Sequence, residues 1–334
     1  MGTGAADRAP GSEIVNQPTT GDRTVPAVAS RSSGRRCLRV IAAVLLFLAG
    51  SLLLLAAIKA GDGGDGAEGR ESPADLGHIH GIGVNPADQE VYVGTHNGVF
   101  RVSEQQPPVL VSAGVQDFMG FTVVGPNHFL ASGHPGRASS ASVGLIESTD
   151  AGVTWAPRSL EGRADFHSLQ ARHGRVYGYD YPTGGLMVTT DLAVWDTRSH
   201  VGLGDFAVSP GNPDVVVGVT EQGVIHSEDG GRSFSKPAGP VLQFLSWADD
   251  EVLVGLTPHG VVHVSVDGGR TWDKRGNLNA PAEAVEAASG SKIYAAADSA
   301  VFVSHDGGRT FAALTPNDPR QSDGQQGSAH HHQR

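Results

Sequence analysis

Cysteine is almost absent from this chain: its 334 residues include one, Cys37. A single cysteine excludes an internal disulfide framework. It lies beside Arg36 rather than after the small apolar residues that a lipoprotein acylation site requires, so we interpret it as incidental. Basic residues are scarce as well, because 24 Lys and Arg against 35 Asp and Glu give a formal net charge of −11. With no basic stripe to offset this charge, the composition argues against nucleic acid as a partner.

Aromatic residues make up only 6% of the chain and charged residues 18%, whereas glycine occurs 46 times. This composition suits a turn-rich all-β protein better than a helical one. The length allows one large domain or two ordinary ones.

One long apolar run lies near the N-terminus. Residues 40–58 are apolar apart from a glycine and a serine, and a helix of this length spans about 28 Å, close to the thickness of the hydrocarbon core of a bilayer. We therefore predict a transmembrane signal-anchor helix over residues 37–59. Residues 1–36 are rich in Gly, Ser, Thr, Pro and Ala without an apolar period, which predicts a disordered tail. The Gly- and acid-rich residues 60–74 predict a flexible linker.

Arginines precede the apolar run and acidic residues follow it. The positive-inside bias then puts the N-terminus in the cytoplasm and the rest of the chain outside it, as a single-pass protein of the cell membrane. A cleaved signal peptide is the alternative. The run is long for the apolar region of a signal peptide, and Ile58-Lys59-Ala60 is a poor cleavage site, but the sequence leaves both interpretations open.

A short phrase recurs along the remainder of the chain and is clearest at Ser265-Val-Asp-Gly-Gly-Arg-Thr-Trp272. Its Ser and Asp side chains can bond the backbone of a tight turn, its glycines supply the positive φ angles, and the closing aromatic residue is a large apolar plug. Further copies occur at residues 304–311, 227–234 and 148–155. A degenerate copy without glycines occurs at residues 189–195. The repeated aspartates are Asp150, Asp191, Asp229, Asp267 and Asp306.

These aspartates are spaced 41, 38, 38 and 39 residues apart, and a period near 40 residues indicates a repeated supersecondary unit. Each unit reads as three short apolar runs separated by turns, then the phrase, then a short last strand, which is typical of one propeller blade. An earlier unit without the phrase covers residues 78–112. The sequence therefore predicts a six-bladed β-propeller over residues 75–316, followed by a polar, disordered tail at 317–334.

If each phrase joins the third and fourth strands, the opposite end of the blades carries the strand two–three hairpins and the starts of the innermost strands. Strand residues two apart point the same way, so His78 and His80 can share one ligand. Imidazoles with a carboxylate suit a Zn²⁺ or copper ion. The alternative is that these histidines bond backbone groups around a polar channel. The candidate metal ligands at this end are His78, His80, His96, His134, His167 and Asp180.

The phrase resembles the Asp-box (BNR) repeat of sialidases and related β-propellers. Together with His78-Ile-His-Gly81, Thr95-His-Asn-Gly98 and Ser132-Gly-His-Pro135, it makes residues 75–315 similar to secreted or membrane-anchored bacterial propellers labelled glycosyl hydrolase or sialidase-like. A sialidase would need three clustered arginines, one in a Phe/Tyr-Arg-Ile-Pro motif. Arg101 follows Phe100 but continues as Val-Ser, so sialidase activity is not expected.

The similarity to non-catalytic Asp-box propellers, such as photosystem assembly factors and sortilin-type receptors, implies a membrane-anchored, extracytoplasmic binding or assembly module. Its partner would be a small polar ligand, a glycan or an extracytoplasmic protein. The alternative is a glycoside hydrolase, which needs two carboxylates about 5–10 Å apart. Whether the chain is an enzyme stays open, because sequence does not measure the separation of the candidate carboxylates Asp165, Asp180, Asp205 and Glu283.

Overall fold

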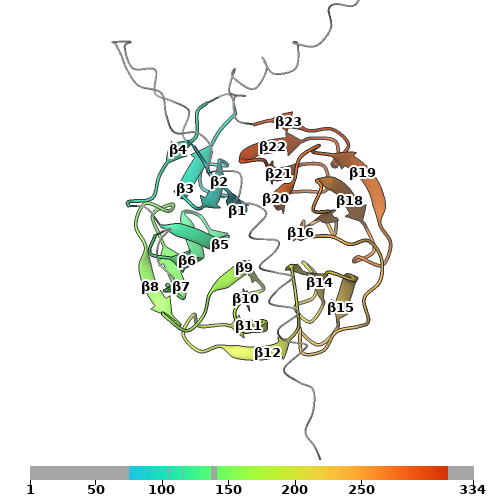
Figure 1. Cartoon of the computed structure of the whole chain (residues 1–334), viewed down its shortest axis with the longest axis horizontal. Coiled ribbons are helices and arrows are strands. Elements are labelled where there is room, and N and C mark those ends of the chain that lie inside the picture. The colour runs from blue at the N-terminus through green and yellow to red at the C-terminus, as the bar shows by residue number, and fades with distance from the viewer. Residues whose placement is uncertain (1–74, 105, 115, 137–140, 315–334) are drawn as a thin grey trace, which may run out of the picture. The chain divides into compact units, whose positions relative to one another are not determined.

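Short runs of Val, Ile, Tyr and Phe that end at Gly, Asn or Pro form the strands of this chain. The computed structural model describes residues 75–104, 106–114, 116–136 and 141–314. Every regular element within these residues is a β-strand. The strands form six antiparallel sheets that stand in a ring (Figure 1). The prediction of a six-bladed, all-β propeller is confirmed for these residues.

Each blade is one continuous stretch of chain whose first strand lies nearest the centre of the ring (Figure 1). Blades one to three contain β1 (Ile79–Val84), β2 (Val91–Thr95), β3 (Gly98–Val102), β4 (Val109–Leu110), β5 (Asp117–Gly125), β6 (His128–His134), β7 (Leu145–Ser148), β8 (Ala156–Ser159), β9 (Phe166–Arg172), β10 (Arg175–Asp180), β11 (Gly185–Thr189) and β12 (Asp196–His200). Blades four to six contain β13 (Asp205–Val208), β14 (Val216–Thr220), β15 (Gly223–Ser227), β16 (Phe244–Trp247), β17 (Leu253–Leu256), β18 (Val261–Ser265), β19 (Asp273–Asn277), β20 (Ala282–Ala287), β21 (Ile293–Ala297), β22 (Ala300–Ser304) and β23 (Ala312–Ala313).

The hydrophobic core lies between neighbouring blades. All five residues of β2 and of β14 are buried, which explains why the second strands read as continuous apolar runs rather than alternating ones. Tyr92 of β2 packs with Phe121 and Phe129 of blade two, its ring centroid 5.0 Å from that of Phe129. Since each sheet is covered on both faces, the ring is a rigid support for residues at its two ends.

The ring closes by packing β1 against β20, and among the described strands none is exchanged between the first and last blades. One apolar cluster combines Ile79 and Val93 of blade one with Tyr294 and Val301 of blade six. Across the same seam, the backbone N–H of Ile79 donates to Glu283 Oε2 at 3.0 Å. The sequence did not predict this closure, because it joins residues about two hundred positions apart.

Blade four departs from the predicted four-strand pattern. Its sheet has three strands, and the segment after the repeated phrase adds only an isolated bridge between Val224 and Ala238. Pro237 and Pro240 flank that bridge and have no N–H to donate to a ladder. The predicted last strand of this unit is therefore wrong.

The repeated turns are built from their own side chains. In the copy at residues 265–272, Asp267 Oδ1 accepts the backbone N–H of Thr271 at 2.8 Å, and Asp267 Oδ2 accepts the Thr271 hydroxyl at 2.6 Å. These bonds, led by the hydroxyl of Thr271, lower the pKa of Asp267 to about 2. The indole N–H of Trp272 donates to Gly269 O at 2.9 Å and holds the ring beneath the turn.

In blades two to six, the repeated turns lie at the end of the blade where the first two strands are joined. In blade four, for example, the N–H of Gly230 donates to Asp214 O in that connection at 2.8 Å. Because strand direction alternates, the start of each innermost strand and the hairpin between strands two and three lie at the opposite end. That end carries the histidines described below.

Within the described residues, no helix has the length and hydropathy needed to cross a bilayer. The predicted transmembrane helix at 37–59, the tail at 1–36, the linker at 60–74 and the tail at 317–334 lie outside those residues. Their assignments stay predictions.

Candidate functional site

The first group of candidate ligands, which we call the His80 cluster, consists of His80, His96 and Asp117. His80 lies near the start of β1, where the register with β2 shifts between Ile79 and Gly81. Such an irregularity re-aims a side chain relative to the regular pleat. His96 lies in the hairpin between β2 and β3, and Asp117 opens β5 of the next blade. Two blades therefore build this cluster.

The two imidazoles of the His80 cluster are in contact. His80 Nε2 lies 3.3 Å from His96 Nε2 and 3.4 Å from His96 Nδ1, and the ring planes meet at 75°. On its other side, His96 Nδ1 lies 2.6 Å from Asp117 Oδ1. The Asp117 carboxylate can only accept a hydrogen bond, so His96 Nδ1 carries the proton of this pair. In the neutral His96 ring, Nε2 then keeps its lone pair.

Burial lowers the pKa of His80 well below its usual value, and the neighbouring charges of His78, His96 and His167 lower it further. His80 is therefore neutral at neutral pH, which is the state in which an imidazole binds a metal. His78 adjoins the cluster, with its ring centroid 4.7 Å from that of His80. Its Nδ1 lies 3.3 Å from Glu283 Oε1, so a second imidazole also faces a carboxylate.

The distances fit a metal centre with an orienting carboxylate. Two nitrogens bound tetrahedrally at about 2.0–2.1 Å from one zinc ion lie about 3.3 Å apart, which matches the separation of His80 Nε2 and His96 Nε2. The 2.6 Å contact to Asp117 is shorter and is a hydrogen bond. Among the described residues, His80, His96 and Asp117 are the group whose three ligand atoms all lie within 4.8 Å of one another.

The second group, which we call the Asp165 cluster, consists of His134, Asp165 and His167. Asp165 Oδ2 lies 3.1 Å from His167 Nε2 and 3.5 Å from His134 Nε2. The His167 ring stacks on Tyr181 with centroids 4.4 Å apart and planes 6° from parallel. Because Asp117 and His134 are paired across β5 and β6, the two clusters are neighbours.

The structure thus separates the predicted metal ligands into two groups. His78, His80 and His96 come together, while His134 and His167 gather around Asp165. Asp180 lies behind that second group, where its carboxylate accepts the Asp165 N–H at 2.8 Å and the Thr183 hydroxyl. Sequence reasoning did not select Asp117 as a partner of the histidines. The available signal was its position at the start of an innermost strand.

The central channel opens beneath the histidines. A cavity of about 110 Å³ is lined by the innermost strands of all six blades, including His80, His167, Asp205 and Glu286. Burial raises the pKa of Asp205 to about 6 and that of Glu286 to about 7. Small-molecule sites usually measure about 300–1,000 Å³, so this channel has room for a few waters or an ion but not for a sugar ring.

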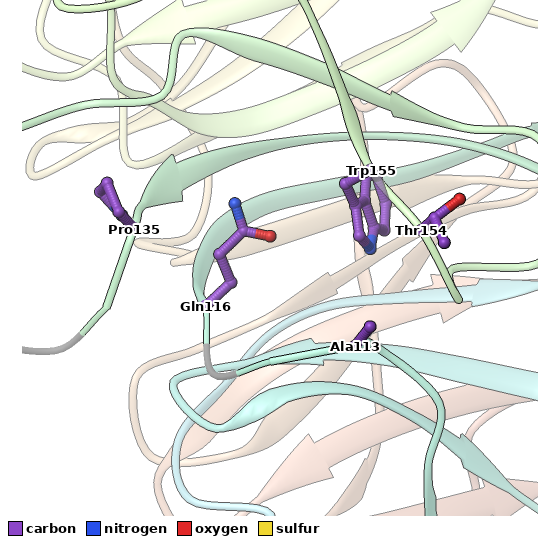
Figure 2. Close-up of a pocket in the computed structure, with 5 residues that line it drawn as sticks. All are labelled: Ala113, Gln116, Pro135, Thr154 and Trp155. Carbon is purple, nitrogen blue, oxygen red and sulfur yellow. The ribbon is translucent and has the colours of Figure 1, made fainter.

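A larger hollow of about 440 Å³ lies between blades one and two, and Figure 2 shows the side chains around it. Its lining has no titratable group. The Thr154 hydroxyl is already bonded to Asp150 Oδ2, and the Trp155 indole N–H to Gly152 O. This hollow could therefore accommodate a ligand by its volume, but it presents few free polar groups to bind one. Its lining residues are Ala113, Gln116, Pro135, Thr154 and Trp155.

No protein-family model and no curated protein matches this sequence. Solved structures do match in fold. A structure of the nidogen/laminin complex has 9% identity and a TM-score of 0.52, covering 68% of this chain and 93% of that one. The WD40 β-propeller domain of Doa1 has 12% identity and a TM-score of 0.51, covering 72% and 83%. An ancestral GH74 enzyme has 14% identity and a TM-score of 0.48 over 70% of this chain, which spans only 37% of that enzyme. The first two similarities show the propeller fold alone.

Proposed function

We propose that this chain is a membrane-anchored, extracytoplasmic binding propeller whose histidine-bearing end holds a transition-metal ion, zinc or copper. The metal lies between His80 Nε2 and His96 Nε2, and the His78 ring lies beside these two imidazoles. The observation that carries the proposal is the 3.3 Å separation of the two Nε2 atoms, combined with the carboxylate that holds the far side of His96.

Carboxylates behind imidazoles are the usual support of metal-binding histidines, because they fix the tautomer and the ring orientation. Asp117 does this for His96, and Glu283 faces His78 in the same way. Two imidazoles leave two positions of a tetrahedral ion open. A small polar ligand or a side chain of an extracytoplasmic partner protein completes the coordination, and the apolar run at residues 37–59 supplies the tether.

We further propose that the repeated turns belong to the Asp-box type of BNR propellers, with a structural role. Their Ser, Asp and Thr groups are committed to one another and to the turn backbone. Glycoside hydrolysis is the weaker alternative, because the channel is too narrow for a sugar ring and Asp180 is bonded to its own blade. A screen with aryl glycosides tests it, and we expect no turnover.

The metal is tested by calorimetric titration of the full chain with Zn²⁺ and with Cu²⁺. His330, His331 and His332 are first changed to Ser, so that this C-terminal tract does not contribute. Changing both His80 and His96 to Ala should abolish one binding event. The matched control is His128→Ala, since the His128 side chain is 34% exposed, as is that of His96, and lies 2.6 Å from the Glu147 carboxylate at the other end of blade two. Equal binding by parent and double variant would reject the proposal.

A further inference from the structure

The ion proposed at the His80 cluster has two imidazole ligands, so a tetrahedral ion there has two more positions to fill. The third member of the cluster, Asp117, is hydrogen-bonded to His96 Nδ1 at 2.6 Å and supports that ring from behind. The remaining positions are therefore open to water, to a partner molecule or to another segment of this chain.

The last described residues direct the C-terminal segment towards the histidine-bearing end of the ring. β23 runs antiparallel to β22, with Ala312 opposite Val303, and the N–H of Leu314 donates to Val301 O at 2.8 Å. Each further residue is thus nearer to the start of β22. That start follows the hairpin from β21, which lies at the same end of the ring as the His80 cluster.

The segment also leaves blade six beside blade one. Leu314 is 4% exposed and belongs to the same apolar cluster as Leu76 and Ile79. Ile79 directly precedes His80, and blade one carries His96 as well. The residues that follow Leu314 therefore begin next to the blade that supplies both imidazole ligands.

The C-terminal segment carries three consecutive histidines, His330, His331 and His332, which we call the histidine tract. His330 is 16 residues beyond Leu314. A chain of that length spans at most about 53–58 Å, and a flexible one averages about 20–24 Å from end to end. The tract can therefore reach the adjoining blade one. His330 and His332 are two residues apart, so in an extended stretch their imidazoles point the same way and can bind one ion.

We propose that the histidine tract binds the ion held by His80 and His96 and completes its coordination within the same chain. This inference rests on the metal site of the proposed function. The tract then occupies the positions that a small polar ligand or a partner side chain would take, and such a ligand binds by displacing it. The competing arrangements are a tract that binds its own ion or none, and a tract that reaches the site of a second copy.

Zinc dissociation constants, measured by competition with a chromophoric chelator, test this arrangement. The full-length proteins are the parent, a tract variant with His330→Ser, His331→Ser and His332→Ser, a site variant with His80→Ala and His96→Ala, and their combination. A tether gives its ligand an effective concentration of about 1 mM, so the parent should bind one ion about 100-fold more tightly than either variant. The control changes three other tail residues, Gln325, Gln326 and Gln333, to Ser and should keep the parent's dissociation constant.

A parent that binds zinc less than about tenfold more tightly than the tract variant would overturn the inference. Two ions in the parent, bound with the constants of the two variants, would overturn it too. So would a zinc-dependent dimer in size-exclusion chromatography that the tract variant does not form. In these outcomes the tract variant still binds one ion through His80 and His96. Failure of the proposed function looks different, because the tract variant and the combined variant would then bind zinc equally.

Discussion

The seam that closes the ring depends on one carboxylate, so Glu283→Ala is the sharpest perturbation of the fold. Glu283 is 6% exposed. Its Oε2 accepts the N–H of Ile79 from blade one, and its Oε1 accepts the N–H of Ser299 from its own blade, each at 3.0 Å. Truncation to Ala removes the acceptor for both backbone groups.

The expected cost follows from these two bonds. A hydrogen bond to a charged acceptor contributes about 1.5–3 kcal/mol, so the two together contribute about 3–6 kcal/mol. Water entering from the partly exposed His78 side recovers part of this, and we expect a net loss of about 3 kcal/mol, which is large against the 5–15 kcal/mol of a typical domain. For a domain of this size, that loss corresponds to a melting temperature lower by about 6–12 °C.

Calorimetry measures the melting temperature, and hydrogen exchange locates the damage. Exchange should accelerate in β1 and β20 before it accelerates in β9 or β10. The matched control is Glu286→Ala on the same strand, because Glu286 Oε2 accepts one long hydrogen bond, 3.3 Å from the Ser246 hydroxyl. A shift below about 2 °C for Glu283→Ala, or an equal shift for both variants, would refute the reasoning.

Three further predictions follow from single side chains. Burial raises the pKa of Glu286 to about 7, so between about pH 4.5 and 7 the native state holds a proton on Glu286 that the unfolded chain has lost. The free energy of unfolding therefore falls over this pH range, by up to about 3 kcal/mol. Glu286→Gln should flatten that part of the pH–stability curve. Thr271→Val should raise the pKa of Asp267 from about 2 towards its ordinary value, as followed by carboxyl NMR; an unchanged titration would contradict the assigned cause. Gly133→Ala should prevent folding or abolish metal binding, because a Cβ there would meet Asp117 O at 1.9 Å with φ at +146°; normal melting and zinc binding would contradict this.

The fold was largely predictable because the sequence patterns that determine it are short and recur along the chain. The Ser-x-Asp-Gly-Gly phrase fixes a turn within eight residues, and its spacing fixes the number of blades. The exceptions come from single residues or from distant contacts. Pro237 and Pro240 remove the last strand of blade four, and the contact between Ile79 and Glu283 joins the two ends of the domain.

The site was predictable in its location but not in its grouping. Positions at the starts of innermost strands indicated which histidines share an end of the ring. The sequence could not show which carboxylate faces an imidazole and which serves the backbone: Asp117 does the first and Asp180 the second. Nor could it separate His134 from His96, since that depends on the register of β5 with β6.

The most direct test of the central claim is anomalous diffraction at the zinc edge from crystals of the protein equilibrated with zinc. The account predicts an anomalous peak about 2.0–2.1 Å from both His80 Nε2 and His96 Nε2, with Asp117 still bonded to His96 Nδ1. Zinc found elsewhere, with no peak between these two imidazoles, would contradict it.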